Sequence, residues 1–328
     1  MTAIAVHNLS KYFYHKKPQK GFWGTLAALV HPEIEEQKAL DSISFEVDTG
    51  EKLAFIGPNG AGKSTTIKIL TGILHPDAGS VRVLDFHPFS ERKKLSYYVG
   101  TVFGGRTQLG HNLPARSSFD LLATLYELEG PTYRARLGEL AEIFELRGLL
   151  EKPPKTCSLG ERMRLEIAAS LLHKPKILFL DEPTVGLDLN AKLHLRTLLN
   201  RLAKEEKVTL FLTSHDTIDI EEISDRVLII DRGRLALSGT LEGLKKKFTR
   251  KKVLTLTFEA ESKPFQYEGI KILERIDNRL TFEIDTAYHS LDRVIHEIMK
   301  TVSIKDLTIE DPSLEEIIRD VYASGLHA

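Results

Sequence analysis

The sequence predicts an α/β protein with a mixed sheet, an antiparallel subdomain and a helical subdomain, followed by a small C-terminal α+β domain. Three observations predict this fold class. Short apolar runs alternate with helical stretches between about residues 98 and 239, as a parallel sheet requires. Residues 114–150 carry helical periodicity and no strand signal. After a basic stretch near residue 250 the strand and helix patterns begin again, and 328 residues is long for a single core.

Nine apolar runs in the first domain have the length and composition of strands. The last two are joined by Asp231-Arg232-Gly233-Arg234, which is typical of a tight turn. Two amphipathic stretches, Ser117–Leu128 and Tyr133–Leu146, predict the helical subdomain at about residues 105–165. The strand candidates are Ile4–Val6, Ile43–Val47, Leu53–Ile56, Val81–Leu84, Tyr98–Val102, Ile177–Leu180, Val208–Thr213, Val227–Ile230 and Leu235–Leu237.

We expect the first domain to span residues 1–243, with an insertion at about 15–37 between its first antiparallel strands. A basic linker at 244–252 leads to a C-terminal domain at 253–328. Asp311 and Pro312 predict the start of the last helix, with Asp as its cap and Pro in its first turn. The elements expected in this domain are the strand Val253–Phe258, a hairpin of Ile272–Ile276 and Leu280–Ile284, the helix Leu291–Met299, the strand Ile304–Ile309 and the helix Pro312–Tyr322.

A phosphate-binding loop follows the strand Leu53–Ile56 and precedes a helical stretch. It fits the pattern G-x-x-x-x-G-K-[ST] at every fixed position. The glycines let the backbone direct its N–H groups at phosphate oxygens, and the helix adds the positive end of its dipole. Lys63 would reach the β- and γ-phosphates, and the Ser64 hydroxyl would help to hold Mg²⁺. The loop residues are Gly57, Pro58, Asn59, Gly60, Ala61, Gly62, Lys63, Ser64 and Thr65. The chain is therefore expected to bind a nucleoside triphosphate.

Two carboxylates follow the buried strand Ile177–Leu180, and a histidine follows the strand Val208–Thr213. Asp181 can hold Mg²⁺ through water, which leaves Glu182 to orient or deprotonate the attacking water. His215, at a strand's carboxyl end, can donate to the γ-phosphate and hold that water in place. An acidic pair or a lone histidine is common without any function, but the phosphate loop gives both a role in hydrolysis.

The net charge, the cysteine count and the length of the apolar runs predict which partners the protein has and where it is located. A net charge of −1 gives no general attraction to nucleic acid, so we expect no nucleic-acid partner. Cys157 is the only cysteine, which precludes an intrachain disulfide and favours a reducing compartment. No signal-peptide pattern is present, and no apolar run approaches the ~20 residues that span a bilayer. We therefore expect a cytoplasmic protein.

Four motifs together resemble the nucleotide-binding domain of ATP-binding-cassette (ABC) proteins over about residues 4–240. They are the loop at 57–65, Asp181-Glu182-Pro183-Thr184, Gly186-Leu187-Asp188 and Ser214-His215-Asp216. The resemblance implies the P-loop NTPase fold of this family and hydrolysis of ATP with Mg²⁺, with Glu182 and His215 as the catalytic residues and Asp181 at the metal.

Between the first two motifs the family carries a signature, Leu-Ser-Gly-Gly-Gln. The equivalent residues 157–161 keep Ser158 and Gly160 but depart from the pattern elsewhere, with Glu161 in the last position. The resemblance implies that the signature contacts the γ-phosphate of ATP held by a second subunit, and that Asp188 lies in a loop of the dimer interface. The active unit is then a head-to-tail pair, either a homodimer or a pairing with another nucleotide-binding domain.

In this family an aromatic side chain near the N-terminus usually stacks on adenine. Tyr12, Phe13 and Tyr14 are the candidates, and the spacing after Leu9-Ser10-Lys11 favours Phe13. The alternative for each of the three is a strand residue that faces the core.

The family normally has a Gln after the strand here expected at Tyr98–Val102, where it meets Mg²⁺ and senses the transporter partner. This chain has Gly104 or Gly105 at that place. Either Gln108 reaches the metal from a shifted loop, or the role is vacant.

Two functions fit the resemblance. In the first, the chain is the ATPase subunit of an exporter, lies on the cytoplasmic face of the membrane and drives a separate permease that docks near residues 103–150. Residues 309–316 are similar to the tail of ATPases that serve drug, antibiotic and polysaccharide exporters, and residues 103–109 resemble a viologen or multidrug branch. In the second, the chain is a soluble ABC ATPase that acts on ribosomes or DNA. The apolar insertion Phe22–Val30 contacts either the membrane or permease, or the chain's own sheet.

Overall fold

The computed structural model describes residues 1–16, 34–105, 107–248, 251–258, 270–286, 290–301, 303–311 and 313–324. The contacts predicted for Phe22 and Trp23 in the insertion lie outside these residues. The chain divides into two compact units, of which the first is Met1–Ser238 and the second begins at Gly239. Among the described residues, no helix combines the length and the apolar character that crossing a bilayer demands.

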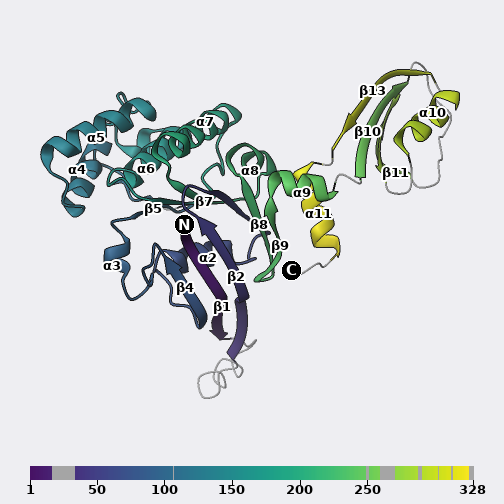
Figure 1. The fold of residues 1–328 in the computed structure, drawn as a ribbon. Helices are drawn as coiled ribbons and strands as arrows, with labels where there is room; N and C mark the ends of the chain where they lie inside the picture. The colour runs from purple at the N-terminus through teal and green to yellow at the C-terminus, as the bar shows by residue number, and fades with distance from the viewer. Residues whose placement is uncertain are drawn as a thin grey trace, which may run out of the picture. The chain divides into compact units, whose positions relative to one another are not determined.

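A six-stranded sheet with the order β5-β6-β7-β3-β8-β9 forms the centre of the first unit (Figure 1). Its first five strands run parallel. All the carboxyl ends of those strands therefore lie at one edge, where ligands bind in parallel α/β sheets. The strands are β3 (Lys52–Ile56), β5 (Val99–Val102), β6 (Ile177–Asp181), β7 (Thr209–Ser214), β8 (Arg226–Asp231) and β9 (Arg234–Thr240). The turn between β8 and β9 has positive φ at Arg232 and Gly233, as expected for a tight two-residue hairpin turn.

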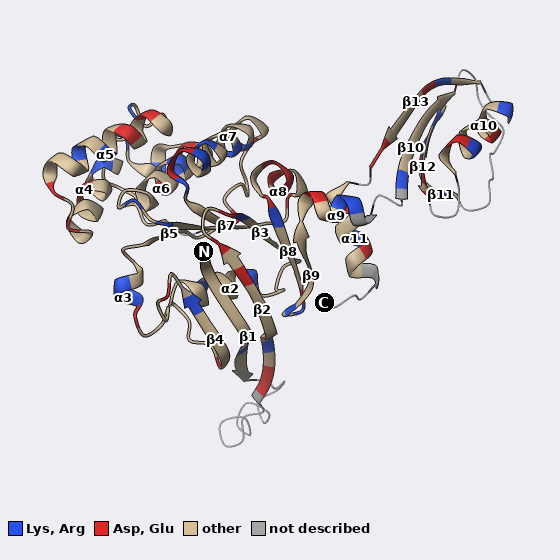
Figure 2. Cartoon of the chain, in the orientation of Figure 1, with Lys and Arg blue, Asp and Glu red and all other residues tan. Residues whose placement is uncertain are grey.

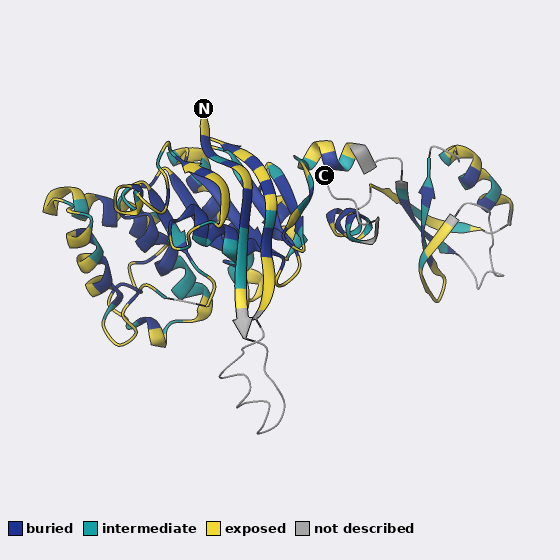
Figure 3. Ribbon diagram, turned by 90° about the horizontal axis from the view of Figure 1, so that it is seen from below, coloured by how far each residue is buried: buried dark blue, intermediate teal, exposed yellow. Residues whose placement is uncertain are grey.

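A second, antiparallel sheet with the order β2-β1-β4 shares its core with the first. It consists of β1 (Thr2–Lys16), β2 (Ile34–Asp48) and β4 (Ala78–Val83). Alternate residues such as Ile4 and Val6 turn inward, because side chains alternate between the two faces of a strand. Phe45 of this sheet packs against Phe55 and Phe211 of the other sheet. Figure 3 shows the strands of this unit mostly buried.

Helices surround the parallel strands, as crossover connections require. They are α2 (Lys63–Leu70), α3 (Arg92–Leu95), α4 (Ala115–Leu125), α5 (Gly130–Ile143), α6 (Leu159–Ser170), α7 (Leu189–Glu206) and α8 (Thr217–Ile223), with a short 3₁₀ turn at Pro154–Thr156. Both helices predicted for the helical subdomain are present as α4 and α5. The buried Arg136 of α5 donates to the Glu206 carboxylate at 2.8 Å and to the Leu171 carbonyl at 3.0 Å, which ties α5 to the ends of α6 and α7.

The second unit is an antiparallel sheet, β11-β12-β10-β13, with α10 on one face. Val294 and Ile298 of α10 pack against Leu254 and Phe282 of the sheet. In addition, α11 packs against α9. Helix α9 occupies much of the stretch that was expected to be a basic linker. The elements are α9 (Leu241–Phe248), β10 (Lys251–Phe258), β11 (Ile270–Ile276), β12 (Arg279–Asp285), α10 (Leu291–Thr301), β13 (Ile304–Glu310) and α11 (Leu314–Ser324).

The predicted cap of the last helix is wrong. Ser313 caps α11 instead of Asp311: its Oγ accepts from the Glu316 N–H at 3.2 Å, and the Glu316 carboxylate accepts from the Ser313 N–H at 2.9 Å. This reciprocal capping box satisfies two backbone donors, which a single Asp cap cannot do. Asp311 forms an ion pair with Lys252. Pro312 lies outside the described residues.

Candidate nucleotide-binding site

The phosphate loop leaves the carboxyl end of β3 and ends where α2 begins at Lys63. Gly62 precedes the helix with φ 112°, a conformation that favours glycine. A Cβ at Gly57 would lie 2.4 Å from the Ile230 carbonyl oxygen, so only glycine lets the loop approach β8 this closely. The other predicted loop residues are Asn59 and Gly60 at an exposed tip, Ala61 buried behind it, and Ser64 and Thr65 in the first turn of α2.

Lys63 joins the loop to the acidic pair. Its side chain is 6% exposed, and its ammonium donates to the carbonyls of Gly57 at 2.7 Å and Pro58 at 3.3 Å. The same ammonium lies 3.5 Å from a Glu182 carboxylate oxygen. A cation is therefore held between the loop backbone and Glu182.

Asp181 and Glu182 end the buried strand β6 and are both held by Thr213 of β7. The Thr213 hydroxyl donates to the Asp181 carboxylate at 2.7 Å, and the Glu182 N–H donates to the Thr213 carbonyl at 3.1 Å. Glu182 has φ 54°, which is uncommon for a residue other than glycine and is often found at functional sites. His215 follows β7, and its Nδ1 lies 2.7 Å from the second Glu182 carboxylate oxygen. The three predicted polar residues are thus brought together beside the phosphate loop.

A cavity of about 600 Å³, which we call the phosphate cleft, opens beside these groups. Ser64, Asp181 and Glu182 line it together, so the two sequence motifs form one site. Leu159 and Met163 of α6 contribute its other wall. His215 is 62% exposed and lies at the edge of the site.

Three signature residues face a different cavity, whereas a fourth, Leu159, lines the phosphate cleft. Ser158, Gly160 and Glu161 line a cavity of about 300 Å³ together with Asp188, and we call it the signature cavity. No residue of the phosphate loop lines it. The phosphate loop and the signature residues Ser158 and Gly160 of one chain therefore line separate cavities.

The signature residues are held by helix capping and close packing. Ser158 caps α6, because its hydroxyl accepts from the Glu161 N–H at 3.1 Å and the Glu161 carboxylate accepts from the Ser158 N–H at 2.8 Å. The hydrogen bond from the Ser158 N–H to the Glu161 carboxylate holds the pKa of Glu161 below its usual range. A Cβ at Gly160 would lie 2.9 Å from the Ala191 Cβ, so glycine permits α6 to approach α7. Asp188 caps α7 and accepts from the Ala191 N–H at 2.9 Å.

Phe13 and Gln108, predicted to contact the adenine and the metal, do not line the phosphate cleft. Phe13 lies on β1, where the Lys11 ammonium sits 5.7 Å from the centre of its ring. The Gln108 amide donates to the Glu166 carbonyl at 3.0 Å, so the structure does not bring it to Ser64 and Asp181. A Cβ at Gly104 would lie 2.8 Å from the Asp181 carbonyl, which accounts for glycine at the place where the family has Gln.

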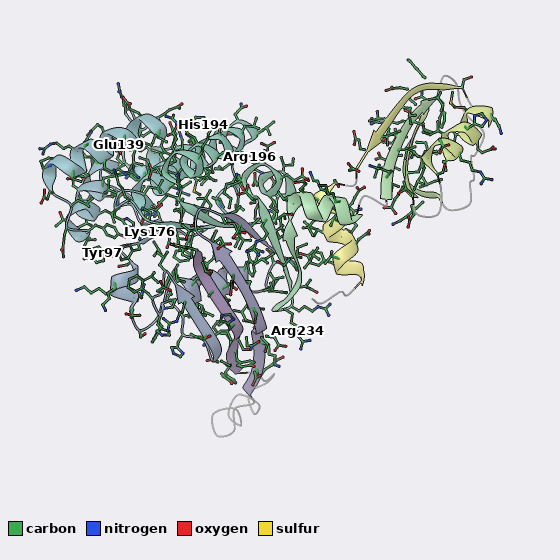
Figure 4. The ribbon with its side chains drawn as sticks, viewed as in Figure 1. Tyr97, Glu139, Lys176, His194, Arg196 and Arg234 are labelled. Carbon is green, nitrogen blue, oxygen red and sulfur yellow. The ribbon has the colours of Figure 1, made fainter. Side chains whose placement is uncertain are left out.

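A buried ion pair behind the site was missed by the sequence analysis. Arg196, labelled in Figure 4, lies on α7 and donates to the Asp219 carboxylate of α8 at 2.6 Å. Asp219 also accepts from Thr184, two residues after Glu182. Lys192 pairs with Asp216 one turn away. Figure 2 shows basic residues along α7 and acidic residues at α8. In the sequence, Lys192 and Arg196 stand four residues apart, and Asp216 and Asp219 stand three residues apart. Residues with these spacings share a helix face, so this pattern was the signal that could have predicted the ion pairs.

Comparisons with known proteins identify the family and the fold of this chain. A family model described as "ABC transporter" matches residues 40–185, and one described as "ATP-binding protein DrrA1-3-like, C-terminal domain" matches residues 239–322. The ABC transporter ATP-binding protein NatA of Bacillus subtilis (strain 168) is 31% identical over 207 residues, which cover 63% of this chain and 84% of NatA.

A second relative matches across both units. The linearmycin resistance ATP-binding protein LnrL of Bacillus subtilis (strain 168) is 29% identical over 298 residues, which cover 87% of this chain and 93% of LnrL. Among solved structures, a dimeric ATP-binding cassette in a post-hydrolysis state with ADP and Pi aligns with a TM-score of 0.61 at 24% identity. That alignment covers 73% of this chain and 98% of the other, and it shows a shared fold.

Proposed function

Because this chain belongs to the ABC transporter family of ATP-binding proteins, we propose that it pairs head to tail with a second copy or a related domain around two ATP molecules. It is an ATPase of that family. The observation that carries the pairing is that Ser158 and Gly160 of the signature line a cavity separate from the phosphate cleft of the same chain. Leu159 within the signature, and Val185 and Leu189 near Asp188 in sequence, are exposed apolar side chains, which supports a partner surface there.

In the proposed mechanism, the loop N–H groups, the start of α2 and Lys63 bind the β- and γ-phosphates. Glu182 accepts the proton of the attacking water, and His215 orients Glu182 through its Nδ1. Donation from the other ring nitrogen of His215 to the γ-phosphate at the same time requires a proton on both ring nitrogens. Lys63, 3.5 Å from Glu182, keeps that carboxylate directed at the reacting phosphate.

We assign the Mg²⁺ site to Ser64 and Asp181. Within the described residues, no Lys or Arg forms an ion pair with the buried Asp181, so its charge is available to a cation. Those residues also contain no cluster of three or more His, Cys, Asp or Glu that could hold a metal. This suits Mg²⁺, which usually takes few protein ligands and completes its shell with water and substrate phosphates. When bound, the ion neutralises charge on the phosphates.

We further propose that the chain serves an exporter and sits on the cytoplasmic face of a membrane beside a separate permease. The resistance function in the name of LnrL and the DrrA1-3-like C-terminal match support this assignment over a ribosomal or DNA role. A second cavity of about 360 Å³, the Tyr126 groove, lies between α4, α6 and β5 and is suited to a permease segment. In its wall the His173 ring stacks on Tyr126 at 3.9 Å, and burial lowers the pKa of His173 to about 4, so this histidine is neutral near pH 7.

Membrane fractionation tests the transporter assignment. The tagged full chain, expressed in its own cells, is expected to sediment with membranes and to retain a polytopic membrane protein after detergent extraction. Ile73→Glu, which places a charge in the groove, should lower the membrane-bound fraction severalfold, whereas Met299→Glu on α10 should not. Recovery in the soluble fraction without a membrane partner would refute the exporter assignment. Equal retention of both variants would refute docking in the groove.

A further inference from the structure

Thr213 is a buried hydroxyl residue to which the proposed mechanism assigns no task. It lies on β7, opposite Asp181 of β6, and is 0% exposed. Its hydroxyl contacts both members of the acidic pair: it donates to Asp181 Oδ1 at 2.7 Å and accepts from the Glu182 N–H at 3.0 Å. Because a hydroxyl carries a single proton, these two contacts fix its direction. One side chain therefore holds both the proposed metal ligand and the proposed general base.

The hydrogen bond to Asp181 decides which carboxylate oxygen is left for the Mg²⁺ site. Oδ1 accepts from Thr213, whereas Oδ2 accepts no hydrogen bond within the described residues. Asp181 lines the phosphate cleft together with Ser64, the other proposed ligand. Oδ2 is therefore the oxygen that can face the ion or its water, and Thr213 stops the carboxylate from rotating. Loss of a residue that orients a metal ligand from behind typically lowers metal affinity or activity about 10–100-fold.

The hydrogen bond from Glu182 holds its backbone in an uncommon conformation. A φ of 54° costs free energy in a residue other than glycine and persists only where the surrounding contacts determine it. The Glu182 N–H donates to both the hydroxyl and the carbonyl of Thr213. The contact between the Glu182 carboxylate and Lys63 cannot replace this hold, because the lysine is needed by the phosphates once a nucleotide binds. Thr213 thus fixes the point from which the Glu182 side chain starts.

The same strand carries a second buried threonine, which has no contact with the acidic pair. Thr209 is also 0% exposed and stands four residues before Thr213, so both side chains lie on one face of β7. The Thr209 hydroxyl accepts from the Gly50 N–H at 2.9 Å, at the amino end of the strand. The two threonines therefore have the same burial and the same element, and they differ in what the hydroxyl holds.

We infer that Thr213 is a positioning residue that holds the Mg²⁺ ligand Asp181 and the backbone of the general base Glu182 in place together. This inference rests on the proposed function, because it concerns the residues of that site. Loss of the hydroxyl frees the Asp181 carboxylate to rotate and leaves the Glu182 N–H with the Thr213 carbonyl alone. Metal binding and the chemical step should then both suffer, whereas the phosphate loop should still bind the nucleotide.

Binding of AMP-PNP to the full chain, with and without Mg²⁺, tests the metal half of the inference without any turnover. In the wild type, Mg²⁺ should lower the Kd. In Thr213→Val, which keeps the shape of threonine but has no hydroxyl, that effect of Mg²⁺ should shrink by about tenfold. The Kd without Mg²⁺ should stay within about twofold of wild type, because the loop and Lys63 supply that binding. Thr209→Val is the control and should keep the full effect of Mg²⁺.

Steady-state hydrolysis of ATP tests the other half. Thr213→Val should lower kcat by about 10–100-fold, whereas Thr209→Val should stay near the wild type. Thr213→Ser retains the hydroxyl and should restore most of kcat and of the effect of Mg²⁺. Thr213→Ala removes the hydroxyl without placing a methyl group beside Asp181, and it takes the place of the valine variant if that chain does not fold.

Three results would overturn the inference: a wild-type effect of Mg²⁺ in the chains that lack the hydroxyl, equal losses in Thr209→Val, or no recovery in Thr213→Ser. Equal losses in Thr209→Val would mean that any buried hydroxyl on β7 acts through stability alone. A wild type that binds no AMP-PNP would instead refute the proposed function, and the inference with it.

Discussion

Glu182→Gln is expected to lower kcat for ATP hydrolysis by roughly a thousandfold and to leave ATP binding intact, because a positioned general base contributes about 10²–10⁴ to the rate. The carboxylate lies between the Lys63 ammonium at 3.5 Å and the His215 Nδ1 at 2.7 Å. A glutamine has the same size and can still contact both groups, but it cannot accept a proton from water. ATP would therefore bind and remain, and the variant should accumulate as an ATP-bound dimer.

Steady-state turnover and size-exclusion chromatography with Mg²⁺ and ATP provide the measurement. Glu142→Gln is the control, because Glu142 is an exposed carboxylate of α5 that pairs with Arg147 far from the phosphate loop in sequence. It should hydrolyse ATP at the wild-type rate and show no trapped dimer. Normal turnover in Glu182→Gln would remove Glu182 as the catalytic carboxylate.

Arg196→Ala is expected to lower the free energy of unfolding of the first unit by about 3–5 kcal/mol, the usual cost of leaving one buried charge without its partner. The Asp219 side chain is fully buried and the Arg196 side chain is 5% exposed. Because Asp219 also accepts a hydrogen bond from Thr184, removal of the arginine should loosen the segment that follows Glu182. Total stability is typically only about 5–15 kcal/mol, so this loss is large.

Arg201→Ala is the matched control on the same helix. Arg201 pairs with Glu205, but both side chains are about half exposed, and such a pair contributes about 0.3–0.5 kcal/mol. Denaturant unfolding followed by circular dichroism should separate the two variants clearly. Equal midpoints would contradict the idea that Asp219 is a buried charge held by Arg196.

The parts of the site that follow from local sequence were predicted well. The phosphate loop and the acidic pair each need only a few consecutive residues after an apolar strand, and the structure places Ser64, Asp181 and Glu182 in one cleft. The parallel order of strands β3 and β6 through β8 then brings His215 to the same edge. This placement could be predicted because the carboxyl ends of parallel strands share an edge.

The features that the sequence did not reveal depend on pairs of residues far apart in the chain. Arg196 and Asp219 are joined only when α7 and α8 pack together. The close approach of Gly104 to the Asp181 carbonyl, which leaves no room for a side chain, is likewise a tertiary contact. The cap of α11, in contrast, could have been predicted from the sequence. Ser313 stands three residues before Glu316, which is the capping-box pattern, but the prediction chose Asp311 as the cap.

Mixing two inactive variants tests the central claim, that one chain carries two halves of different sites. Lys63→Ala removes the phosphate-binding cation, and Ser158→Arg blocks the signature at a cost of about 1 kcal/mol for the lost cap. Each variant alone should be inactive. In a head-to-tail dimer of both, one site joins the intact loop of one chain to the intact signature of the other. Mixed in equal amounts, they should regain about a quarter of wild-type ATPase activity, because half the dimers form one intact site of two. A mixture as inactive as its components would contradict a site shared between chains.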